Sequence, residues 1–101
     1  MTPIERIQEM EGHLNTYQGL IEELEACLKR VEAGQSSYIA LRDYYTSQVY
    51  MEDVELSNQP DFSEEVYCGV LSEDAVYDLL DEHYQKAVEM LDLATKMLKE
   101  R

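Results

Sequence analysis

The stretch that decides the fold is residues 7–31, IQEMEGHLNTYQGLIEELEACLKRV. Its apolar residues recur at alternating intervals of three and four, which is the heptad spacing of an amphipathic helix. The neighbouring positions are mostly apolar too, so the stripe is wider than a two-stranded seam and better suited to a helical bundle. The stripe contains Ile7, Met10, Leu14, Tyr17, Ile21, Leu24, Leu28, Val31 and, after polar Gln35, Tyr38; its flanks are His13, Leu20, Cys27 and Leu41.

The ends of this helix carry their own signals. Thr2 and Pro3 supply a helix start, with Glu5 close to the reach-back position of a capping box. Helical spacing continues to about residue 47, although the tetrapeptide that begins at Gly34 can kink or break the helix. We therefore predict a long N-terminal helix over about residues 3–47, and the sequence leaves its continuity through Gly34 open.

The opposite face of this helix carries small residues. They could admit a closely approaching second helix, but alanine also simply favours helix, and glycine is tolerated there at a cost of about 1 kcal/mol each. These residues, seven apart, are Gly12, Gly19, Ala26, Ala33 and Ala40.

The stretch CGVLSEDAVYDLL at residues 68–80 begins the C-terminal half. Gly69 is expected to adopt an unusual backbone conformation, and Ser72 is a good N-cap, with Glu73 and Asp74 at the positive helix end. Val70 and Leu71 would pack before the helix in the manner of a hydrophobic staple. A second heptad stripe then follows: Tyr77, Leu80, Tyr84, Ala87, Leu91, Ala94 and Leu98.

These patterns predict an all-α fold in a single domain, residues 1–101. The long N-terminal helix is expected to pack antiparallel on one or two C-terminal helices, about residues 73–81 and 83–100, because Asp81 to His83 can interrupt the pattern. Residues 48–71 are predicted to be an irregular acidic connection with room for one short helix around residues 49–54.

Acidic charge is concentrated in the middle of the chain. The formal net charge is -14, and residues 43–82 carry twelve acidic and no basic side chains, with five of the eight tyrosines. Such a segment disfavours direct nucleic-acid binding, since phosphate contacts need cations, and favours a basic protein partner. The alternative is a solvated acidic surface. The candidate partner surface comprises Asp43, Tyr44, Tyr45, Tyr50, Glu52, Asp53 and Glu55.

No complete metal or catalytic set is found in the sequence. A magnesium pattern that starts at Glu22-Glu23 and would finish at Glu89 and Asp92 lacks its third acid, because that position is Ala26. Cys68 has His83 as its only plausible neighbouring base, and no oxyanion donors can be identified. We therefore predict no catalytic, cofactor or metal residues. The scattered zinc-ligand types are His13, Cys27, Cys68 and His83.

The sequence also bears on location. No stretch approaches the about 20 apolar residues of a membrane span, and the N-terminus lacks the apolar run of a signal peptide. We expect a cytoplasmic protein that does not bind membranes, in which Cys27 and Cys68 stay reduced rather than forming a disulfide.

Four segments carry a family resemblance. ERIQEME near the N-terminus, RDYY at residues 42–45, CGVLSEDAVYDLL and LATKMLK at residues 93–99 together resemble the bacterial domain-of-unknown-function family numbered 4298. The resemblance spans nearly the whole chain and implies a small, acidic, mostly helical protein with no assigned activity. The family pattern follows the paired tyrosines with glycine and then tryptophan, where this chain has Thr46 and Tyr50.

Two functions remain after these exclusions. The first is a non-enzymatic interaction protein that self-associates, most simply as a dimer, through the apolar stripe or the small-residue face. The second is an acidic inhibitor or immunity-like protein that covers a basic surface or mimics nucleic acid. A magnesium-dependent nucleotide pyrophosphatase-like enzyme is a remote third.

Overall fold

The computed structural model describes residues 1–63, 65–72 and 74–101, and the regular secondary structure of these residues is helical, with no strand. The all-α prediction is confirmed. Two units are distinguished along the chain, Met1–Tyr38 and Ile39–Arg101, and each is described by itself. The single-domain organisation and the antiparallel packing stay predictions.

The first unit is dominated by α1, Pro3–Ala33, which contains no buried residue. Thr2 is its N-cap: the Thr2 hydroxyl accepts a hydrogen bond from the Glu5 backbone N–H and donates one to the Glu5 carboxylate, both at 3.1 Å. Pro3 costs nothing there because the first N–H groups of a helix have no partner in the helix. The predicted start is therefore confirmed in atomic detail.

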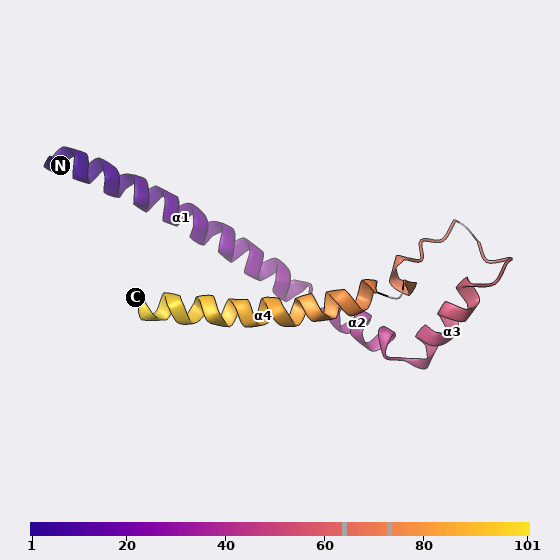
Figure 1. Cartoon of the computed structure of the whole chain (residues 1–101). Coiled ribbons are helices and arrows are strands. Elements are labelled where there is room, and N and C mark those ends of the chain that lie inside the picture. Colours follow the sequence, from indigo (N-terminus) through magenta and orange to yellow (C-terminus); the bar gives the residue numbers. More distant parts are fainter. Residues whose placement is uncertain (64, 73) are drawn as a thin grey trace. The chain divides into compact units, whose positions relative to one another are not determined.

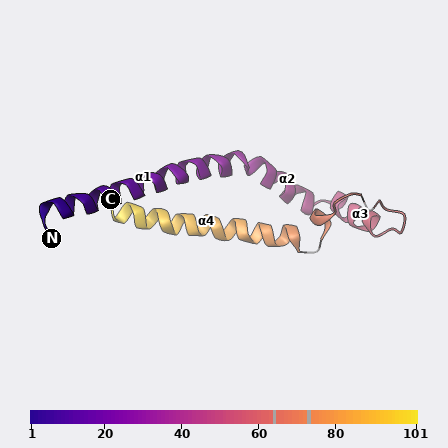
Figure 2. The ribbon, with the colours of Figure 1, turned by 90° about the horizontal axis from the view of Figure 1, so that it is seen from above.

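The long helix is interrupted at Gly34, between α1 and α2, Gln35–Tyr45 (Figure 2). The Gly34 carbonyl accepts from the backbone N–H groups of both Ser37, at 3.0 Å, and Tyr38, at 3.2 Å. The side-chain amide of Gln35 donates a hydrogen bond to the Val31 carbonyl at 3.1 Å. Of the alternatives left open by the sequence, an interruption at Gly34 is correct.

The second unit continues with the rest of α2 and then α3, Gln48–Ser57, so the N-terminal helical run ends at Tyr45 rather than at about residue 47. Ser47 is the reason: its hydroxyl accepts from the Tyr50 N–H at 3.2 Å and starts α3. The short helix expected around residues 49–54, within the connection 48–71, is α3, which is longer than expected because it begins at Gln48 and ends at Ser57.

After α3 the chain turns at Asn58 and Pro60 and leads to a short 3-10 helix, η1, Gly69–Leu71, which contacts both α3 and α4. Figure 1 shows this connection leaving the end of α3 and returning to the start of α4. None of the described glycines has a positive φ, so the unusual backbone expected at Gly69 is absent. Gly69 instead begins η1.

The last element is α4, Ala75–Lys99, a single helix. Asp81 does not interrupt α4. Its carboxylate accepts a hydrogen bond from the side-chain amide of Gln85 at 2.8 Å, one turn further along the surface of the helix. Of the one or two C-terminal helices predicted, one is correct. The predicted start at residue 73 lies outside the described residues.

The buried core of the described residues is small. Among the residues that the structure describes, only Tyr50, 9 % exposed, and Val76, 2 % exposed, are buried. Of the first two residues of the second heptad stripe, Tyr77 is exposed and Leu80 is half-buried. The fold therefore depends on local helix signals more than on a packed centre.

Candidate functional site

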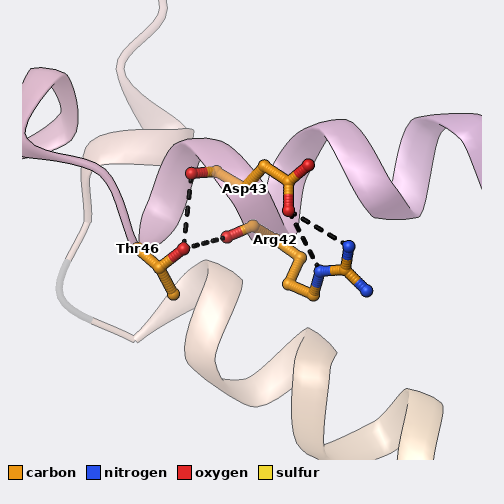
Figure 3. Close-up of polar contacts among 3 residues, drawn as sticks. All are labelled: Arg42, Asp43 and Thr46. Carbon is orange, nitrogen blue, oxygen red and sulfur yellow. Dashed lines mark hydrogen bonds and ion pairs between the residues drawn. The ribbon is translucent and has the colours of Figure 1, made fainter.

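The junction between α2 and α3 is held by two hydroxyl side chains. The Thr46 hydroxyl donates a hydrogen bond to the Arg42 carbonyl at 3.0 Å and lies 3.4 Å from the Asp43 carbonyl (Figure 3). The hydroxyl thereby occupies carbonyl acceptors at the end of α2. The Ser47 hydroxyl donates to the Tyr44 carbonyl at 2.6 Å. With its carbonyls occupied, α2 stops and the chain turns into α3.

This turn brings three tyrosines together. The Tyr44 and Tyr50 rings meet edge to face with their centroids 5.5 Å apart, and Tyr45 tilts against Tyr50 at 5.1 Å. Edge-to-face pairs of this kind are favoured by the ring quadrupoles. Tyr50 is thereby buried at the centre of the cluster.

The Tyr44 hydroxyl reaches α3 and donates to Asp53 Oδ2 at 2.6 Å. The hydrogen bond to Asp53, followed by desolvation and the negative charge of Asp53, raises the pKa of Tyr44 from 10.0 to about 12. The phenol, already protonated at physiological pH with its ordinary pKa of 10.0, therefore stays protonated to higher pH. Its role in the site is that of a fixed donor which orients the carboxylate.

Next to this pair lies a cleft of about 260 Å³, slightly smaller than the about 300 to 1,000 Å³ of typical small-molecule pockets. α2 and α3 contribute one wall, and the connection with η1 contributes the other. Most of the lining is apolar, and the Tyr44–Asp53 pair is its main polar feature. The lining residues are Tyr44, Asp53, Leu56, Phe62, Val66, Tyr67, Cys68, Val70 and Leu71.

The predicted partner surface divides into two groups. Tyr44, Tyr45, Tyr50 and Asp53 lie together in the cluster just described. The other three members are exposed and outside the cleft lining: Asp43, Glu52 and Glu55.

Of those exposed carboxylates, Asp43 has a close basic neighbour. Arg42 Nη2 and Nε lie 3.1 and 3.2 Å from Asp43 Oδ1 (Figure 3). Such an exposed pair contributes little to stability, about 0 to 1 kcal/mol. Asp43 is thus partly neutralised, while Glu52 and Glu55 are exposed acidic residues of α3.

Sequence reasoning expected Val70 and Leu71 to pack before the C-terminal helix but missed that they line a cleft together with Phe62 and Val66. The available signal was the presence of apolar residues within an acidic connection. Their convergence depends on the return of the chain along α3, which periodicity cannot reveal.

The predicted structural residues lie where α4 starts. The Ser72 hydroxyl accepts from the Ala75 N–H at 3.2 Å, and the Asp74 carbonyl accepts from the Asp78 N–H at 2.8 Å. The Asp74 side chain makes no capping hydrogen bond. Glu73 lies outside the described residues. Val70 and Leu71 are half-buried in the cleft wall.

The residue types that bind metals are dispersed. Among the described residues, no group of three or more His, Cys, Asp or Glu side chains is arranged to hold a metal ion. His13 and Cys27 are exposed on α1, where His13 lies 3.9 Å from Glu9. Cys68 is a free, half-buried thiol in the cleft lining, and His83 is half-buried on α4.

The acids of the incomplete magnesium pattern lie on two helices. Glu22 and Glu23 belong to α1, in the first unit, and Glu89 and Asp92 belong to α4, in the second. Glu89 is engaged by Lys86, whose ammonium is 3.0 Å from Glu89 Oε2.

Comparison with known proteins identifies the family. Over the residues described, no helix has the length and apolar character needed to cross a membrane. Among curated proteins, none matches this chain. The family described as "Domain of unknown function (DUF4298)" matches residues 7–93, from the first turn of the α1 stripe to near the end of α4. The protein therefore belongs to the DUF4298 family, which confirms the resemblance drawn from its sequence.

Proposed function

We propose that this protein is a non-enzymatic protein-interaction module that forms a homodimer through the apolar stripe of α1. One observation carries the proposal: α1 is 31 residues long, about 46 Å at 1.5 Å per residue, and buries none of its side chains. A helix of this kind gains most of its stability in proteins from tertiary packing of an apolar face. A second copy supplies that packing.

The exposed apolar surface of α1 is large and continuous. The eight stripe residues from Ile7 to Val31 are between 37 % and 59 % exposed. Contiguous apolar patches beyond a few hundred Å² are uncommon on monomeric proteins and mark interaction sites. The stripe therefore supports association with another helix.

The surface of α1 also supports helix pairing. Leu14, Tyr17, Gln18 and Ile21 surround a hollow, with Glu22 at its side. Their spacing of three, four and seven is that of the four-residue hole which accepts one side chain of a facing helix in a coiled coil. Identical helices can supply both the holes and the side chains that fill them.

Sedimentation equilibrium of paired variants tests the proposal. Leu14→Gln with Ile21→Gln removes two apolar groups from the stripe, and the control Thr16→Gln with Glu23→Gln makes the same number of changes, also seven residues apart, on another face of α1. We expect wild type and control to sediment at twice the 11.8 kDa of the chain at micromolar concentration. The stripe variant should dissociate at least about tenfold more readily, since each lost apolar contact contributes of order 1 kcal/mol.

Two outcomes would contradict homodimerisation. A wild-type chain that sediments only as an 11.8 kDa species would remove its basis. Equal weakening by the stripe variant and the control would show that the apolar stripe is not the interface.

A second candidate function is an acidic inhibitor or immunity-like protein that covers a basic surface. Its support is the exposure of Glu52 and Glu55 on α3, within residues 43–82, which have no basic side chain. Rim charges of this kind mainly accelerate association in a salt-dependent way. The test uses a basic partner captured at low salt. The double variant Glu52→Gln with Glu55→Gln should slow association with that partner more than the control double variant Glu11→Gln with Glu32→Gln on α1. Failure to capture any basic partner would count against it.

A further inference from the structure

The cleft beside the Tyr44–Asp53 pair combines a carboxylate with apolar walls, and neither the dimer proposal nor the exposed acidic surface uses it. We propose that this cleft binds a small organic amine, with its ammonium group at Asp53 and a short apolar or aromatic body between the two walls.

The charge of the cleft points to a cation. Asp53 is half-buried, and Tyr44 occupies only its Oδ2. Within the part of the chain that the structure describes, the four ion pairs lie elsewhere, and none involves Asp53. A carboxylate partly removed from water is stabilised by a cation, and none of the described residues that line the cleft is a Lys or Arg. A cationic ligand supplies the missing charge.

The walls select what the cation is attached to. Leu56, Phe62 and Leu71 contribute apolar side chains to the same lining as the carboxylate. The volume, about 260 Å³, suits a small body rather than an extended one. Bare metal ions would leave this apolar lining unused, whereas an alkyl or aryl group of the amine would bury it.

The aromatic rings of the lining add to the recognition. Tyr44 belongs to α2 and Phe62 to the connection after α3, and both rings line the cleft. A cation over the face of such a ring is attracted by its quadrupole. Tyr44 is itself held by its contact with Tyr50 and by its hydrogen bond to Asp53. The carboxylate is therefore oriented before a ligand arrives, with Oδ1 left as the acceptor for an ammonium N–H.

The proposal is tested by titrating phenethylamine into the full chain at neutral pH, with calorimetry and NMR shift changes as readouts. The matched ligand is phenethyl alcohol, which has the same body without the charge. We expect saturable millimolar or tighter binding of the amine, and binding of the alcohol weaker by at least about tenfold, the effect of losing a charge-assisted hydrogen bond. Shift changes should centre on Phe62 and Leu71.

Matched variants locate the charge. Asp53→Asn keeps the side-chain shape and an oxygen that can accept from Tyr44, while Glu52→Gln removes the same charge from the adjacent, exposed position. We expect amine affinity to fall at least about tenfold in Asp53→Asn and to stay within about twofold of wild type in Glu52→Gln. The ligand series uses the wild-type chain, so it tests the proposal even if the Asp53 variant does not fold.

Three results would overturn the proposal. One is the absence of saturable amine binding to wild type, and another is equal loss of affinity in the two variants, which would indicate unspecific attraction to an acidic protein. The third concerns a lysine side chain, which has the same ammonium chemistry. Tighter, Asp53-dependent binding of a blocked Ala-Lys-Ala peptide than of phenethylamine would assign the cleft to a protein partner instead.

Discussion

Replacing Gly12 or Gly19 by alanine should stabilise this protein, and the reason lies on the face of α1 opposite its apolar stripe. A Cβ atom built at either glycine has no atom within 4 Å outside the local helix backbone. The substitution therefore adds no clash and fills no cavity. What remains is the intrinsic helix preference, which favours alanine because glycine loses more backbone freedom on folding.

The intrinsic helix preference alone sets the expected gain in the free energy of unfolding. Glycine is about 0.8–1.0 kcal/mol less favourable than alanine in a helix interior, so each change should add about 1 kcal/mol to the free energy of unfolding. For a chain of 101 residues, 1 kcal/mol corresponds to a rise in Tm of about 5 °C. The double variant should gain about 10 °C, because sites this far apart without shared contacts act additively.

The assay is thermal and urea unfolding followed by far-ultraviolet circular dichroism, at one fixed protein concentration because a self-associating protein has a concentration-dependent Tm. Gly34→Ala is the internal contrast. A Cβ at Gly34 would lie 3.3 Å from the Arg30 carbonyl oxygen and 3.5 Å from that of Val31. This crowding should cancel part or all of the gain seen at the other two glycines.

Loss of stability in both Gly12→Ala and Gly19→Ala, with helix content unchanged, would refute this reasoning. It would mean that a second helix approaches this face so closely that even a methyl group is rejected. The homodimer would then use the small-residue face, and the apolar stripe would need another role. The glycine series thus separates the two interfaces that the sequence left open.

The remaining predictions concern the second unit and α1. Ser72→Ala removes the acceptor of the Ala75 N–H and should cost about 1 kcal/mol, a fall in Tm of about 5 °C, in thermal unfolding. In a spectrophotometric titration, Tyr44 should ionise near pH 12. Because folding raises its pKa, the contribution of Tyr44 to the free energy of unfolding is complete below pH 10 and is lost as the pH rises through 12. Tyr44→Phe should therefore reduce the fall in stability over that pH range. Breaking the exposed ion pair of Glu25 and Lys29, 3.1 Å apart, with Glu25→Gln should change the free energy of unfolding by less than about 0.5 kcal/mol in urea titrations.

Features that depend on neighbouring residues could be predicted from the sequence. The start of α1 at Thr2 and Pro3 and the interruption at Gly34 are both set within one or two turns of helix. The heptad spacing of the stripe likewise defines a helix face without reference to the rest of the chain. The predicted start of α1 was right because local hydrogen bonds determine it, whereas at Gly34 the sequence indicated the place of a possible break and left the choice open.

Features that depend on a side chain with two possible local roles were harder to predict from the sequence. An aspartate such as Asp81 can end one helix and cap the next, but here it bonds to Gln85 and the helix continues. In the same way, Ser47 and Thr46 could have been loop residues, and only their hydrogen bonds show that they separate α2 from α3. Propensity does not decide between such alternatives, because each uses the same donors and acceptors.

The candidate cleft was only half predictable. Tyr44 and Asp53 were chosen for charge and aromatic content, and the structure brings them within a hydrogen bond. Phe62 and Leu71 come from a connection without periodicity, whose path returns along α3. No pattern in a single sequence encodes that return.

The interruption at Gly34 divides the chain into parts that should differ in amide hydrogen exchange. α1 has ordinary backbone hydrogen bonds but no buried side chain, so in a free monomer its amides should open locally and exchange quickly. The segment around Tyr50 is anchored by the tyrosine cluster and should exchange more slowly. Slowed exchange over α1 alone would then report when a partner occupies the stripe, residue by residue, and Gly34 would mark where that protection ends.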